Sequence, residues 1–156
     1  MACKEPPAAE QQQATTPTND ARTPADSVHG YRSSDFEMIA WLRGYWIGTN
    51  EGGSTVYEKY EAMNDTLIRG LTYNDSSFSK ASDTTLIYVA HSRVFLQHRQ
   101  QRWVATVIDS ADVHFLPFER ADGQMQINRN SPAQWTRTKE VPTHGSRLIT
   151  SFRARH

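Results

Sequence analysis

The stretch Trp41–Gly48, which reads WLRGYWIG, decides the fold of this chain, because a helix-like pattern ends within it and a series of short alternating segments begins. Before it, Phe36 and Ile39 recur with Trp41 at helical spacing, and Gly44 can end a helix in the left-handed conformation. After Gly44 the hydrophobic period changes to two, which is the period of β-strands. The sequence therefore predicts one short helix followed by an all-β domain.

The expected helix has a clear start. Ser33-Ser34-Asp35 offers side chains that favour an N-cap, and Glu37 stands three residues after Ser34, as in a capping box. We therefore expect the helix to begin at these serines and to end before Gly44.

Ten strands are expected after the helix, separated by turn residues such as Asp122-Gly123, which is the strongest hairpin signal. The connections are too short for crossover helices, so neighbouring strands should pair antiparallel in up-and-down order. Closure into a barrel removes exposed sheet edges, so the pattern predicts an antiparallel up-and-down closed barrel of about ten strands. The expected strands lie at residues 45–50, 54–62, 66–73, 84–90, 93–98, 103–109, 112–118, 124–129, 133–139 and 147–154.

The first part of the chain has a different composition. Residues 1–30 contain no Phe, Trp or Tyr, but they hold four of the seven prolines and the run Gln11-Gln12-Gln13. Such a segment buries too little apolar surface to offset the entropy of ordering it. We therefore expect residues 1–32 to form a disordered linker of the lipoprotein type and residues 33–156 to form the barrel domain.

The charge pattern excludes one class of partner. The chain has no net formal charge, and the +5 of residues 76–156 comes from arginines spread one per strand or turn. A nucleic-acid interface normally shows a concentrated basic stripe, so we expect no nucleic-acid partner.

The single cysteine predicts a location. No run of about 18 apolar residues, the length that a membrane-spanning helix needs, is present. Ala2-Cys3-Lys4, followed by the linker, is similar to the acylated terminus of a bacterial lipoprotein, where Cys3 carries the lipid. We therefore expect a lipid-anchored protein of the bacterial envelope that touches the membrane only through that anchor. A cytoplasmic protein with an ordinary cysteine is the alternative. One cysteine can form neither a disulfide framework nor a Cys-based metal site.

Three stretches resemble a lipocalin-like, calycin-type family of bacterial envelope proteins that form a domain of unknown function. They are Trp41–Gly48, Tyr57-Glu58-Lys59-Tyr60 and Asn64–Tyr73, and the resemblance extends over residues 36–154. It implies structural roles for Trp41, Gly44, Trp46 and Gly48, with Trp46 packing across one end of the barrel. The chain departs from the family pattern at Asn130–Gln134, where relatives have a His-Asp-Phe-Pro-like stretch.

Strand alternation places Val56, Glu58 and Tyr60 on one face, and the resemblance implies that Glu58 and Tyr60 point inward. A carboxylate inside a barrel needs a cation or several donors, and Arg69 or Arg137 could supply them. The alternative is a surface Glu58 that pairs loosely with a basic residue.

The function expected from this architecture is binding of a small hydrophobic or amphipathic molecule in a barrel cavity. Glu58 and Arg137 would orient its polar end, and an aromatic lining would surround the rest. An interior void below about 300 Å³ would favour the alternative, a packed barrel that acts through its outer surface as an interaction scaffold. The expected aromatic lining residues are Tyr60, Tyr73, Tyr88, Phe95 and Trp135.

Catalytic, metal and cofactor sites are not expected. The histidines lack His-x-His or His-Glu-x-x-His spacing, and there is no Gly-x-Ser-x-Gly elbow. Haem binding of the nitrobindin type would require His114 or His144 to reach the pocket. An enzyme acting on a small hydrophobic substrate would require Glu58 or a histidine to be buried beside a partner with a strongly shifted pKa.

Overall fold

The computed structural model of the protein describes residues 30–155. Residues 1–29 of the expected linker, and with them acylation of Cys3, lie outside the described residues. The first described residues already contact the domain, because the Tyr31 amide donates a 2.8 Å hydrogen bond to the carbonyl of Ser92.

A short helical segment precedes the barrel, as the sequence predicts. It consists of α1, Ser33–Phe36, and the 3-10 helix η2, Glu37–Leu42. The expected capping box of Ser34 and Glu37 is wrong. The Asp35 carboxylate instead accepts a hydrogen bond from the Arg32 backbone N–H at 2.8 Å, so the cap forms at the residue before Ser33. Within residues 30–155 no helix is both long enough and apolar enough to span a membrane.

Ten strands follow in the described part of the chain, and all ten lie close to their predicted positions. The largest shift is in β4, which begins at Ala81 rather than at residue 84. A short 3-10 helix, η3, Pro142–His144, separates the last two strands. The strands are β1 Gly44–Asn50, β2 Thr55–Asn64, β3 Leu67–Tyr73, β4 Ala81–Ala90, β5 Arg93–His98, β6 Gln101–Ile108, β7 Asp112–Glu119, β8 Met125–Ser131, β9 Gln134–Val141 and β10 Ser146–Ala154.

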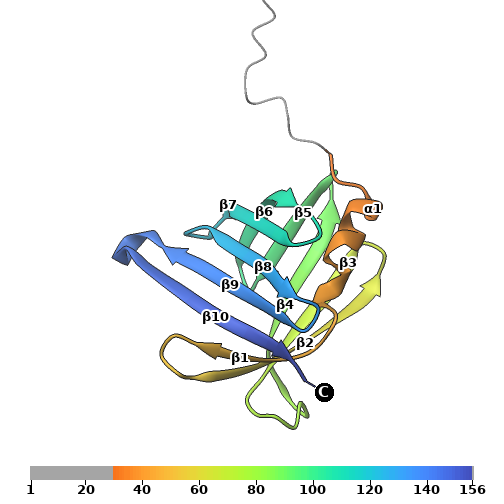
Figure 1. Ribbon diagram of the computed structural model, residues 1–156. Coiled ribbons are helices and arrows are strands. Elements are labelled where there is room, and N and C mark those ends of the chain that lie inside the picture. Colours follow the sequence, from red (N-terminus) through yellow and green to blue (C-terminus); the bar gives the residue numbers. More distant parts are fainter. Residues whose placement is uncertain (1–29, 156) are drawn as a thin grey trace, which may run out of the picture.

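The sheet closes on itself as an antiparallel up-and-down barrel (Figure 1). Each strand pairs with the next in the chain, and β1 pairs with β10 through partners such as Trp46 with Ala154 and Gly48 with Phe152. Because the order is up-and-down, the β1–β2, β3–β4, β5–β6, β7–β8 and β9–β10 connections all lie at one end, which we call the loop end. The helical segment lies at the opposite end, which we call the helix end.

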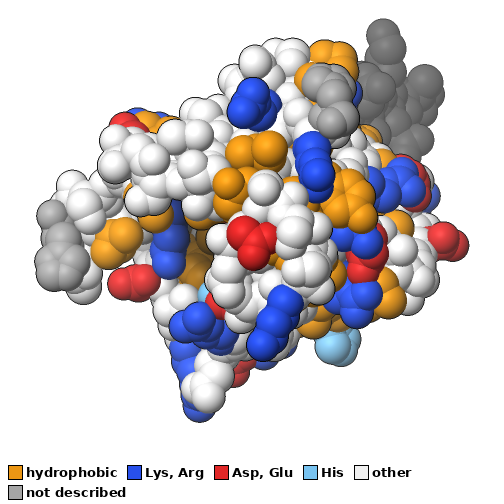
Figure 2. Space-filling model, turned by 90° about the horizontal axis from the view of Figure 1, so that it is seen from below, with side chains coloured by type: hydrophobic (Ala, Val, Ile, Leu, Met, Phe, Trp, Pro, Cys, Tyr) orange, Lys and Arg blue, Asp and Glu red, His pale blue; other side chains and the backbone are white. Residues whose placement is uncertain are grey.

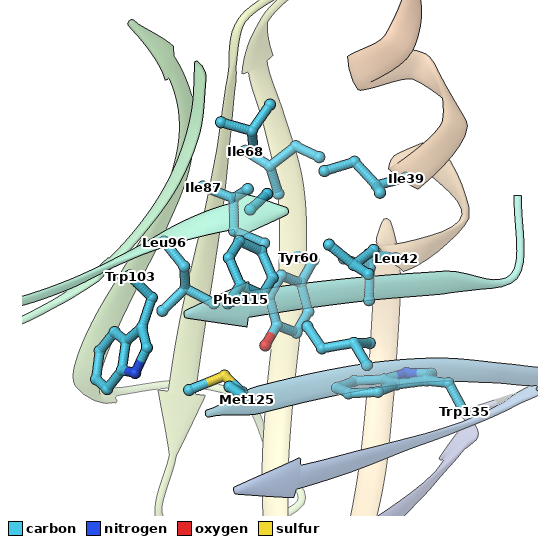
Figure 3. Packing of buried hydrophobic residues seen from close by; sticks show 14 of the residues in the cluster. Ile39, Leu42, Tyr60, Ile68, Ile87, Leu96, Trp103, Phe115, Met125 and Trp135 are labelled. Atoms are coloured by element: carbon cyan, nitrogen blue, oxygen red, sulfur yellow. The ribbon is translucent and has the colours of Figure 1, made fainter. Parts of the chain in front are cut away.

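The core is concentrated toward the helix end. Ile39 and Leu42 of η2 are fully buried and join the aromatic and aliphatic side chains inside the barrel (Figure 3). Trp46 is also buried, and its indole Nε1 donates a 2.6 Å hydrogen bond to the Leu42 carbonyl, which ties β1 to the helical segment. Trp46 thus has the structural position expected of it.

Two glycines allow close approach inside this fold. A Cβ atom on Gly48 would lie 2.6 Å from the Phe152 ring and 2.6 Å from Val56, so only glycine leaves room for that ring. Gly123, in the β7–β8 connection, has φ of +70°, and a Cβ there would lie 1.5 Å from the carbonyl oxygen of Glu140. The Gly123 carbonyl also accepts the Trp103 indole N–H at 3.0 Å, so this loop is fixed against the barrel wall.

We predict that Gly123→Ala lowers the free energy of unfolding by about 4 kcal/mol or more, because the loop must leave both Glu140 and Trp103. Gly53→Ala is the matched control: its φ is +79°, but nothing lies within 4 Å of the added methyl group, so the expected loss is about 1 kcal/mol. Urea-induced unfolding measures both values. Equal losses in the two variants would contradict the close packing at Gly123.

Candidate functional site

The interior near the loop end is hollow. A cavity of about 290 Å³ is lined by side chains from eight of the ten strands. Figure 2 shows a recess on this side of the molecule with hydrophobic side chains in its depth and basic side chains at its border. Leu96, Trp103, Met125 and Ile127 form its apolar wall. The polar lining comprises Glu58, Tyr60, Thr72, Asp83, Thr85, His98, Gln101, Arg137, Lys139 and Thr150.

An ion pair crosses the barrel at the base of this cavity. Arg137 on β9 donates from Nη2 to Glu58 Oε1 at 2.9 Å and from Nη1 to Glu58 Oε2 at 3.2 Å. Tyr60, two residues along β2, donates its hydroxyl to Glu58 Oε2 at 2.8 Å. Only 5% of Glu58 is exposed. We call Glu58, Tyr60 and Arg137 the polar cluster, and all three have the inward orientation expected from the sequence.

The choice between the two candidate arginines is settled by this geometry. Arg137 is the partner of Glu58, whereas Arg69 pairs with Glu61, to which its Nε donates at 3.0 Å. Glu61 alternates with Tyr60 along β2 and therefore lies on the outer face of the barrel. The alternative of a surface Glu58 is wrong, because the carboxylate is buried and takes both hydrogen bonds of the guanidinium fork.

Two members of the polar cluster, Tyr60 and Arg137, hold their protons firmly. Burial raises the pKa of Tyr60 well above 10.0, and the negative charge of Glu58 raises it further. Burial alone would lower the pKa of Arg137, but Glu58 and Tyr60 together raise that pKa above its ordinary value. Glu58 is thus buried beside a tyrosine whose pKa is strongly raised, which is the arrangement that the enzyme alternative requires. The shift, however, moves titration away from neutral pH, where a general acid or base must work.

Trp135 supports the polar cluster from the helix end and does not line the cavity. Its ring stacks on Phe152 at 3.9 Å between centroids, and it makes edge contacts with Trp46 at 5.8 Å and Tyr60 at 6.0 Å. The Arg137 guanidinium lies 5.0 Å from the Phe152 centroid. Trp135 was expected in the pocket lining and lies instead in the packed half of the barrel (Figure 3).

Three other expected lining residues face away from the axis. Thr72 lines the cavity, so its neighbour Tyr73 points outward, where it contacts Phe78 at 5.1 Å. Tyr88 and Phe95 stack on each other at 5.6 Å, on the face opposite to the buried Ile87 and the cavity-lining Leu96. The expectation that these three rings turn toward the interior is wrong, because strand alternation overrides the preference of aromatic rings for a core.

The cavity also contains residues that the sequence interpretation missed. Asp83, Thr85 and His98, which we call the mouth cluster, lie on β4 and β5 near the loop end. His98 Nε2 lies 3.3 Å from Asp83 Oδ2, and His98 Nδ1 lies 3.1 Å from Thr85 Oγ1. Arg99 also donates to Asp83, at 2.8 Å. Burial alone would raise the pKa of Asp83, but the Thr84 N–H and Arg99 hold it below 3.8. The sequence signal for this cluster is the spacing of Asp83 and Thr85, which places both side chains on one face of the strand.

The described residues offer no preformed metal site, since no three His, Cys, Asp or Glu side chains converge within 30–155. His98 lines the cavity and is engaged by Asp83 and Thr85. His114 stands between the buried Val113 and Phe115 in β7 and therefore faces the other side of the strand. His114 therefore does not point into the barrel, where haem binding of the nitrobindin type would require it as a ligand.

Comparison with protein-family models and with curated proteins finds no match. Among solved structures, a redesigned β-barrel, b11L5F_LGL, is 13% identical, with a TM-score of 0.35 over 75% of this chain and 94% of that one. EF1p2_mFAP2b, in a structure with bound DFHBI, is 16% identical, with a TM-score of 0.35 over 79% of this chain and 98% of that one. Similarity at this level says nothing about the ligand of this chain.

We predict that Arg137→Met lowers the free energy of unfolding by about 3–5 kcal/mol, because it leaves the Glu58 carboxylate buried without a cation. The double variant Glu58→Leu with Arg137→Met should recover most of that loss, since both charges are then removed together. Chemical denaturation of the two variants measures the difference.

Arg69→Met is the matched control for this pair. It breaks the ion pair with Glu61 on the outer face, where solvent screens the charges, and should cost less than about 1 kcal/mol. A loss in Arg137→Met no larger than that in Arg69→Met would contradict a buried polar cluster.

Proposed function

We propose that the protein binds a small hydrophobic or amphipathic molecule in the cavity at its loop end. The observation that carries the proposal is the division of the barrel interior. The helix end is packed with aromatic rings, and the loop end contains a cavity whose base is the polar cluster. A concave, mainly apolar site with a few convergent polar groups is the usual form of a ligand pocket.

Volume alone does not separate binding from the packed-barrel alternative. The 290 Å³ of the cavity coincides with the dividing value of about 300 Å³. A cavity at this lower end of the range for ligand pockets suits a small ligand. Phe118 is 49% exposed on the outer face. Because an exposed ring can contact a partner protein, an interaction scaffold is the second candidate function.

The chemistry of the lining favours binding. Moving Glu58 and Arg137 out of water costs several kcal/mol per ion, and a barrel that only needs filling could use apolar side chains of the same volume. Thr72, Thr85 and Gln101 add residues with hydroxyl and amide groups to the lining of the cavity. These groups suit a ligand with a polar part, and the wall of Leu96 and Trp103 suits an apolar part.

We predict that Thr72→Phe abolishes binding of eight-carbon amphiphiles, because the new ring occupies the cavity. Wild-type protein should show a saturable change in the emission of Trp103, which lies in the cavity wall, with affinity rising by about 0.8 kcal/mol per methylene of the ligand. Thr84→Phe is the control, since Thr84 is exposed on the other face of β4. Equal binding by all three proteins would place the ligand outside the cavity and contradict the proposal.

We further propose that the protein belongs to the lipocalin-like envelope family and is tethered to the membrane through a lipid on Cys3. The stretch Trp41–Gly48 supports the family, and the tether is supported by Ala2-Cys3-Lys4 and by the hydrophilic stretch that follows it. Such a tether would hold the barrel away from the lipid surface while leaving the cavity accessible.

We predict that Cys3→Ser moves the protein from the membrane fraction to the soluble fraction in a bacterial cell that processes lipoproteins. The substitution removes the proposed site of lipid attachment and leaves the barrel unchanged. Fractionation together with incorporation of labelled palmitate measures both effects. Wild-type protein that is soluble and unlabelled would overturn the lipid anchor without affecting ligand binding.

A further inference from the structure

The charged side chains that line the cavity are not all paired with one another. The Glu58 carboxylate is neutralised by Arg137 at 2.9 Å. The Asp83 carboxylate is neutralised by Arg99 at 2.8 Å and faces His98 at 3.3 Å. Lys139 also lines the cavity, yet it forms no ion pair with any side chain in the described part of the chain. Because Asp83 is held by Arg99 from outside the lining, Lys139 is the lining cation that has no ion-pair partner among the described residues.

The fold holds this cation at a defined place. Lys139 lies two residues beyond Arg137 on β9, so both side chains project from the same face into the barrel. Its Nζ lies 5.2 Å from the centroid of the Trp103 ring, which is 1% exposed. The indole ring attracts the ammonium group and keeps it over the apolar wall. Lys139 pairs in register with Met125 and Leu148, and both of these residues also line the cavity.

We infer that the cavity selects an anionic amphiphile: a carboxylate on a short apolar chain or ring. This inference deepens the proposed binding function and rests on it. The carboxylate would pair with the Lys139 ammonium near the mouth, and the apolar part would lie against Leu96, Trp103 and Ile127. A cavity of about 290 Å³ suits one short apolar chain, so we take the ligand to be a free carboxylate.

Ligands of other charge fit the same cavity less well. A cation would find both carboxylates already engaged, Glu58 by Arg137 and Asp83 by Arg99, and would meet repulsion from Lys139. A neutral molecule would make the same apolar contacts but would leave the ammonium group without a partner. The order of affinity is therefore octanoate, then octanol, then octylamine, with equal apolar chains isolating the effect of charge.

Isothermal titration calorimetry of the full chain at pH 7 with these three ligands tests the inference. Wild-type protein should bind octanoate at least about tenfold more tightly than octanol, which is the usual scale of a hydrogen bond to a charged group. Lys139→Met should remove that preference, weakening octanoate about tenfold and changing octanol less than about twofold. Lys80→Met is the matched control: Lys80 is exposed and outside the cavity lining, so this variant should behave as wild type.

The outcomes separate this inference from the function on which it rests. If octanol binds as tightly as octanoate, or if Lys139→Met leaves the preference intact, the selection of anions is overturned and the binding function stands. If octylamine binds most tightly, the charge assignment is reversed. If none of the three ligands binds to wild-type protein, the proposed function and the inference fall together. Circular dichroism of each variant confirms that the barrel is retained.

Discussion

The ion pair between Glu58 and Arg137 is the interaction on which the internal arrangement of this barrel depends. A carboxylate in a protein interior is costly unless a cation and hydrogen-bond donors meet it. Here the guanidinium of Arg137 and the hydroxyl of Tyr60 meet it from β9 and β2. Because these strands lie apart around the barrel, the pair fixes side chains across the interior rather than between neighbours. It forms a polar layer between two regions of different chemistry.

On the side of the helix end, the layer rests on aromatic rings. Trp135 stacks on Phe152, and the small size of Gly48 leaves space for that second ring. Trp46 closes the packing by its hydrogen bond to Leu42 of the helical segment. Burial of these rings is the main apolar stabilisation near the pair, and it leaves no room there for a ligand. On the other side, threonines and Lys139 line the interior together with Trp103, and a cavity remains between them.

Much of the fold could be predicted because alternation and turn residues are local signals. The ten strands, their order and the inward position of Glu58 follow from the period of two after Gly44. The site was harder to predict. Arg137 stands 79 residues from Glu58, and no local pattern distinguishes it from Arg69. Ring type alone favours an inward position for Tyr73, Tyr88 and Phe95, whereas inward neighbours such as Thr72 and Leu96 place these rings outside. The helix is capped by the Asp35 carboxylate, which accepts from the Arg32 N–H. The preference of serine for N-caps does not determine at which residue the chain turns into the helix.

The most direct test of the divided interior is a map of water–protein cross-relaxation by NMR on the ligand-free protein. The account predicts exchange with water at the methyl groups of Thr72, Thr85 and Met125, which line the cavity, and none at Ile39, Ile68 and Ile87 near the helix end. Absence of water signals from the first group would mean a filled barrel. Equal signals from both groups would mean that no layer separates the two ends, and either result would contradict the central role of the Glu58–Arg137 pair.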